Sequence, residues 1–111
     1  MTAVRRYGLI AKIKPGCEQE YIDYHNEKMW PEIKKAISER GIKNYSIYLS
    51  DGYLFAYYES DPNCFDKKLD QYLSDPIGAE WEKKMAQFID PLHVTENGNL
   101  WKEMQEIFHM E

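Results

Sequence analysis

The chain has 111 residues, the size of one small domain with a single modest core. Its formal net charge of −5 argues against a nucleic-acid partner, which would call for a basic stripe. No apolar run reaches the length of a membrane span, and the first residues do not form a signal peptide. We therefore expect a cytoplasmic protein that binds neither nucleic acid nor a membrane.

The first half of the sequence predicts a strand and an interrupted helix. Residues 7–13 alternate between larger apolar and smaller or polar side chains, which is typical of a strand. From 17 to 40 the apolar side chains recur at helical spacing. Pro31 lies inside this helix and has no amide hydrogen to donate, so we expect a kink or a break near residues 26–30.

A β-hairpin is predicted next. Residues 43–49 and 53–59 are rich in β-branched and aromatic side chains, which favour strands. They are separated by Ser50-Asp51-Gly52, and Asp-Gly between two such runs is a strong hairpin signal.

Two helices and a strand complete the predicted elements. Ser60-Asp61-Pro62 and Ser74-Asp75-Pro76 each place a capping residue before a proline, a pattern typical of a helix start. The helices are expected over residues 65–73 and 77–89, and the last strand over 100–110.

The order of these elements, βαββαβ, predicts an α+β ferredoxin-like fold, in which an antiparallel sheet carries helices on one face. The other face would be open. We expect Tyr45, Phe55, Tyr57 and either Trp101 or Met104 to make this face too apolar for water. Two such sheets can pack face to face, so we predict a homodimer with a dimeric α/β barrel.

The histidines and cysteines give no sign of a metal site. His25, His93 and His109 do not have the spacing of a ligand pair, and no H-E-x-x-H sequence occurs. Cys17 and Cys64 lie far apart, with no C-x-x-C pattern, so neither a zinc site nor a disulfide framework is expected.

The most informative motif is E-Y-x-x-x-H-N-x-x-x-W-P-E over residues 20–32, followed by N-Y-x-I-Y-L over residues 44–49. The first places Tyr21 and His25 one helical turn apart, on one face. Together the two motifs resemble the L-rhamnose mutarotase family, and the resemblance covers nearly the whole chain. It implies a small cytoplasmic homodimer that needs no cofactor and interconverts the anomers of free L-rhamnose, with residues 1–111 forming one domain.

The resemblance also implies the site residues. The catalytic histidine of the family corresponds to His25, and its substrate-binding residues correspond to Tyr21, Tyr45 and Trp81. The family has a second tryptophan after the one at Trp81, but this sequence has Glu82 there.

Two further residues in the motifs are predicted to be structural. Trp30 is expected to fix the break before Pro31 and to cover the core. Asn44 is expected to form a hydrogen bond at a strand edge, although it could also reach a sugar hydroxyl.

Histidine suits the chemistry that this family performs. Mutarotation opens a cyclic hemiacetal to the aldehyde and recloses it from the other face. One group must take the proton of the anomeric hydroxyl while another protonates the ring oxygen. Histidine can do either near neutral pH because its ordinary pKa is about 6.5. The sequence leaves open which group acts as acid and which as base.

Other functions also fit parts of the pattern. The same chemistry could act on L-fucose or another deoxyhexose. A cofactor-free monooxygenase or a haem-binding protein could use the same dimeric barrel, since a fold alone does not define a function. A non-catalytic sugar-binding module is the remaining alternative.

Overall fold

The computed structural model describes residues 4–61, 75–90 and 100–111. Its four strands form one antiparallel sheet in the order β2-β3-β1-β4. The strands are β1 (Arg5–Lys12), β2 (Ile42–Ser50), β3 (Tyr53–Ser60) and β4 (Lys102–Met104). The helices are α1 (Glu18–Tyr24), α2 (Pro31–Glu39) and α4 (Pro76–Ala86).

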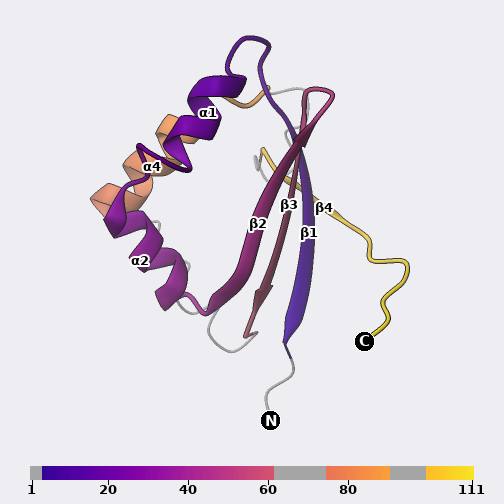
Figure 1. Cartoon of the computed structure of the whole chain (residues 1–111). Helices are drawn as coiled ribbons and strands as arrows, with labels where there is room; N and C mark the ends of the chain where they lie inside the picture. The colour runs from indigo at the N-terminus through magenta and orange to yellow at the C-terminus, as the bar shows by residue number, and fades with distance from the viewer. Residues whose placement is uncertain (1–3, 62–74, 91–99) are drawn as a thin grey trace.

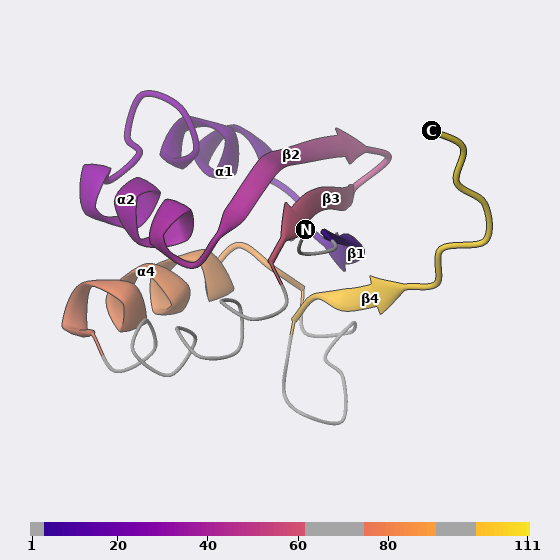
Figure 2. The ribbon, with the colours of Figure 1, turned by 90° about the horizontal axis from the view of Figure 1, so that it is seen from below.

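The three described helices cover one face of the sheet (Figure 1). None of them lies over the other face, and the C-terminal segment lies on that side. Figure 2 shows the same separation from below. The ferredoxin-like α+β architecture predicted from the sequence is therefore confirmed. The predicted helix over residues 65–73 lies outside the described residues. None of the helices in the described ranges is long and apolar enough to span a membrane.

The predicted interruption between residues 26 and 30 is confirmed as a complete break. The helix α1 ends at Tyr24, and α2 begins at Pro31 with Trp30 as its N-cap residue. Proline is well suited to this first helical position because the amide it lacks would have no partner within the helix.

The predicted hairpin is also confirmed. Asp51 and Gly52 both adopt left-handed backbone angles, with φ of 53° and 80°. Two successive residues with positive φ match the twist of the strands that they join.

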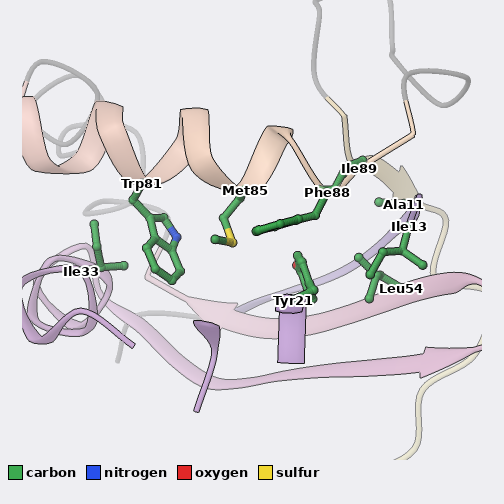
Figure 3. Packing of buried hydrophobic residues seen from close by; sticks show 9 residues of the cluster. All are labelled: Ala11, Ile13, Tyr21, Ile33, Leu54, Trp81, Met85, Phe88 and Ile89. Atoms are coloured by element: carbon green, nitrogen blue, oxygen red, sulfur yellow. The ribbon is translucent and has the colours of Figure 1, made fainter. Parts of the chain in front are cut away.

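The core lies between the sheet and the helices. Figure 3 shows Trp81 and Met85 extending from α4 into this layer and Phe88 extending from the turn just after α4, with Tyr21 beside Phe88. The buried residues of this cluster come from both layers: Ala11, Ile13, Tyr21, Ile33, Leu54, Trp81, Met85, Phe88 and Ile89.

The prediction for the open face was partly wrong. Phe55 and Tyr57 alternate with the buried residues of β3 and so point away from the helices. Met104 also lies on the open face, where its methyl group approaches Gly8. However, Tyr45 packs against the buried Tyr58, and Trp101 packs against the core, so both lie on the helix-covered side. For Tyr45 the cause is an irregularity in β2 between residues 43 and 46.

The last strand is shorter than predicted, because only Lys102–Met104 pair with β1. After Met104 the chain leaves the sheet and is held by side chains instead. The guanidinium of Arg6 donates two hydrogen bonds to Glu106, of 2.9 and 3.2 Å. Beyond this contact Ile107 is 88% exposed, and residues 105–111 form no strand, so the prediction of a strand as far as residue 110 was wrong.

We predict that Leu54→Ala lowers the free energy of unfolding by about 2–5 kcal/mol, because Leu54 is fully buried and its loss leaves a cavity. Leu49 pairs with Leu54 in the hairpin but is much more exposed, so Leu49→Ala is the matched control and should cost about 1 kcal/mol or less. Urea denaturation of both variants at one protein concentration measures the difference. Equal losses would contradict this description of the core.

Candidate active site

A pocket opens between the helices and the covered face of the sheet, with a volume of about 490 Å³. This volume lies within the range of small-molecule sites. Its walls come from α2 and α4, from the segment that follows α1, and from the sheet and the residues beside it: Leu9, His25, Asn26, Met29, Lys34, Ile37, Arg40, Ile42, Tyr45, Ile47, Tyr58, Trp81, Glu82 and Trp101.

His25 is positioned by the end of α1, as its C-cap residue. The ring nitrogen Nδ1 lies 2.8 Å from the carbonyl oxygen of Tyr21, one turn earlier. Because a carbonyl oxygen can only accept, Nδ1 must carry the hydrogen and donate it. In the neutral ring, Nε2 then carries the lone pair and is able to accept a proton.

Burial and hydrogen bonding act in opposite directions on the pKa of His25. Burial lowers the pKa, since removal from water disfavours the charged imidazolium, and the hydrogen bond to the Tyr21 carbonyl partly opposes this effect. Burial is the stronger influence, so the imidazole is neutral at pH 7 and can act as a base.

Trp81 forms the wall beside the histidine. It is buried on α4, and its ring meets the imidazole of His25 edge-on, with centroids 5.6 Å apart. Trp30 packs against the far side of Trp81 at 5.2 Å and is not among the residues that line the pocket. This position agrees with the structural role predicted for Trp30.

Tyr45 reaches the pocket from β2, on the sheet side. Although the residue is 40% exposed, desolvation of its hydroxyl raises the pKa, and Tyr58 and Glu82 raise it further against the opposing effect of Arg40. The raised pKa keeps the phenol protonated, so that it can donate a hydrogen bond to a ligand.

Tyr21 lies behind the histidine instead of in the pocket wall. It is 4% exposed, its ring lies 4.3 Å from that of His25, and burial raises the pKa of its hydroxyl. The structure thus brings His25, Trp81 and Tyr45 to one pocket and places Tyr21 as a support for the imidazole. A direct contact between Tyr21 and a substrate stays a prediction.

The pocket also contains charged residues that the sequence analysis did not identify as site residues. Lys34 and Arg40 lie on or just after α2, and Glu82 follows Trp81 on α4. The sequence contained a signal for Glu82, which follows the predicted substrate-binding residue Trp81 and stands where the family has its second tryptophan. It contained none for Lys34 and Arg40, which resemble ordinary residues of a charged helix face. Among the described residues, no group of three or more His, Cys, Asp or Glu side chains could hold a metal ion.

Fold and pocket together define a small α+β protein with a compact ligand site of one histidine, tyrosines and tryptophan. The sequence model of the L-rhamnose mutarotase family matches residues 6–110, and the chain belongs to this family. An L-rhamnose mutarotase from Listeria monocytogenes is 32% identical over 96% of this chain and 99% of its own length. Another from Flavobacterium johnsoniae is 31% identical over 96% and 95%.

Solved structures show the same fold. The crystal structure of an L-rhamnose mutarotase from Formosa agariphila has a TM-score of 0.74 and 24% identity, covering 96% of this chain and 99% of that one. A NIPSNAP family protein from Agrobacterium tumefaciens has a TM-score of 0.64 and 14% identity, covering 81% and 80%.

We predict that the pKa of His25 lies below the ordinary value of 6.5, which an NMR titration of the imidazole Cε1 proton measures. Between the folded and unfolded pKa values the unfolded chain binds more protons, so acidification through this window removes stability. The variant His25→Gln lacks this effect, and the wild type should therefore lose stability relative to it below about pH 6.5. A pKa at or above 6.5 would contradict the prediction.

Proposed function

We propose that this protein is an L-rhamnose mutarotase and that residues 1–111 act as one catalytic domain, with His25 as the acid/base group. The observation that carries the proposal is the hydrogen bond from His25 Nδ1 to the Tyr21 carbonyl, at 2.8 Å. It fixes the tautomer and the orientation of a half-buried imidazole at the wall of a pocket, beside a tryptophan. The choice of L-rhamnose as the sugar rests on the names of the relatives, which are L-rhamnose mutarotases.

The proposed reaction begins when Nε2 of neutral His25 takes the proton of the anomeric hydroxyl. The electron pair of that O–H bond forms the aldehyde C=O, and the bond between C1 and the ring oxygen breaks. A general acid gives a proton to the ring oxygen, which yields the open-chain sugar, and this acid takes a proton back when the ring closes. After rotation about the C1–C2 bond, the same steps in reverse close the ring from the other face. No net proton is gained or lost.

The neighbouring side chains have roles that suit this sequence of steps. Trp81 offers an apolar face to the C–H groups of the sugar, as aromatic rings do in many ligand sites. The protonated hydroxyl of Tyr45 can donate a hydrogen bond to a sugar oxygen. Tyr21 holds the imidazole through its carbonyl and its ring, and its hydroxyl is proposed to contact substrate.

We predict that His25→Ala slows the catalysed exchange of the L-rhamnose anomers by about 10²–10⁴-fold, which is the usual contribution of general acid–base catalysis. Saturation-transfer NMR of the α and β anomeric protons measures the exchange directly. Gln19→Ala is a matched control on the same helix, because Gln19 is exposed and its side chain donates a hydrogen bond to Asp23.

Exchange of other sugars, binding of sugars and titration with haem test the alternative functions. If L-fucose or another deoxyhexose exchanges its anomers faster than L-rhamnose does, the protein is a mutarotase of that sugar instead. Binding of these sugars without accelerated exchange would favour a sugar-binding module. A Soret band on titration with haem, with no sugar exchange, would contradict the proposal.

We further propose that the protein is a cytoplasmic homodimer whose subunits pack through the open face of the sheet. Large apolar or aromatic side chains remain on that face, with Tyr48 63% exposed and paired with Phe55 in the hairpin. The C-terminal segment lies on the same side of the sheet (Figure 1), and its residue Phe108 is 77% exposed. Such a surface is better covered by a second copy than left in water. The free thiol of Cys17 suits a reducing compartment.

We predict that Tyr48→Lys weakens this dimer by at least about tenfold, because it places a charge within the apolar face. Ile22→Lys is the control, since Ile22 is a partly exposed apolar residue of α1, on the helix side. Sedimentation equilibrium of the two variants and the wild type measures the dissociation constants. A monomeric wild type, or equal dissociation constants for Tyr48→Lys and the wild type, would contradict the interface.

A further inference from the structure

The strand β2 contains a β-bulge immediately before the pocket. Lys43 pairs with Glu59 and Ser46 pairs with Tyr57, so the two residues 44 and 45 lie opposite the single residue Tyr58. A bulge of this kind adds one residue to a strand and re-aims the side chains that follow. Here its first residue, Asn44, adopts a left-handed conformation with φ of 52°.

The added residue decides which face Tyr45 occupies. Side chains alternate along a strand, so without the bulge Tyr45 would share the open face with Lys43. With it, Tyr45 packs on Tyr58 on the covered side, with ring centroids 5.3 Å apart, and lines the pocket beside Ile47. The position of one proposed sugar contact thus depends on the backbone of the preceding residue.

The side chain of Asn44 is held away from the pocket by one hydrogen bond to Glu59, and the same carboxylate accepts a second hydrogen bond from Tyr57. The amide of Asn44 donates to Glu59 Oε1 at 3.1 Å, and the hydroxyl of Tyr57 donates to Glu59 Oε2 at 2.8 Å. These donors, Tyr57 first, hold the pKa of Glu59 below its usual value. Asparagine also tolerates the left-handed region better than most residues other than glycine.

We propose that Asn44, anchored by Glu59, is a positioning residue that directs Tyr45 into the active-site pocket. The inference rests on the proposed function to the extent that Tyr45 contacts the sugar. Asn44 itself does not line the pocket, so its effect on binding must pass through the backbone of β2. The predicted strand-edge hydrogen bond of Asn44 is confirmed as its contact with Glu59. In this proposal the contact anchors the residue that positions Tyr45.

Two substitutions separate the backbone from the side chain. Asn44→Gly keeps the left-handed conformation accessible, whereas Asn44→Val strongly disfavours it because valine is β-branched. We expect Asn44→Val to raise the KM for L-rhamnose about tenfold, the equivalent of one lost hydrogen bond, with kcat changed less than about twofold. Asn44→Gly should raise KM by less than about threefold, because only the side-chain contact is lost.

Each substitution is repeated in the variant Tyr45→Ala. If Asn44 acts through Tyr45, then Asn44→Val has no further effect on KM in that background, within about twofold. The same increase in KM with and without the Tyr45 side chain would overturn the proposal, as would an equal loss in Asn44→Gly and Asn44→Val. If Asn44→Val does not fold, the smaller Asn44→Ala takes its place, because alanine loses the same side-chain contact as glycine but disfavours the left-handed conformation, and the same comparison applies.

A second readout does not depend on activity. In protein labelled with 3-fluorotyrosine, the ¹⁹F signal of Tyr45 is assigned by its loss in Tyr45→Phe. Asn44→Val, or Asn44→Ala in its place, should shift that signal, and Asn44→Gly should leave it near the wild-type position. An unshifted signal in Asn44→Val, or in Asn44→Ala where that variant replaces it, would overturn the positioning role. A shifted signal in a protein that exchanges no sugar would instead overturn only the proposed function.

Discussion

The orientation of His25 in the pocket depends on one hydrogen bond, from its Nδ1 to the carbonyl of Tyr21. This carbonyl is available because α1 ends at Tyr24, and the last carbonyls of a helix lack amide donors from a following turn. The backbone amide of His25 donates to the carbonyl of Ile22 instead. The side chain of Asn26 also donates to this Ile22 carbonyl, at 2.8 Å. Two polar side chains thus cap the helix, and one of them is the proposed catalytic group.

The same break arranges the aromatic residues around the imidazole. Because α2 begins afresh at Pro31, its N-cap residue Trp30 turns back onto Trp81, which in turn lies against His25. The ring of Tyr24, the last residue of α1, also meets Trp81 edge-on, with centroids 6.3 Å apart. A continuous helix from residue 17 to residue 40 could not bring these rings to one point, so the proline contributes to the site without touching it.

The sequence predicted the features that depend on local chemistry. Pro31 marked the break, Asp51-Gly52 marked the hairpin, and the spacing of Tyr21 and His25 marked a shared helix face. The side of the sheet that Tyr45 occupies could not be predicted, because the bulge lies in the pairing of β2 with β3, where Asn44 contacts Glu59, fifteen positions away. The end of the last strand depended likewise on how far β1 could pair with it. Both errors concern interactions between strands, which periodicity within one strand does not contain.

The packing that stabilises the fold also sets the basicity of the site. An acid/base catalyst works best when its pKa lies near the operating pH, since both protonation states must then be accessible. Burial lowers the pKa of His25, and the Tyr21 carbonyl limits the decrease. The burial comes from Tyr21 and Trp81, which belong to the core cluster. A looser core would therefore admit water to the imidazole and raise its pKa, so that stability and proton transfer are determined by the same contacts.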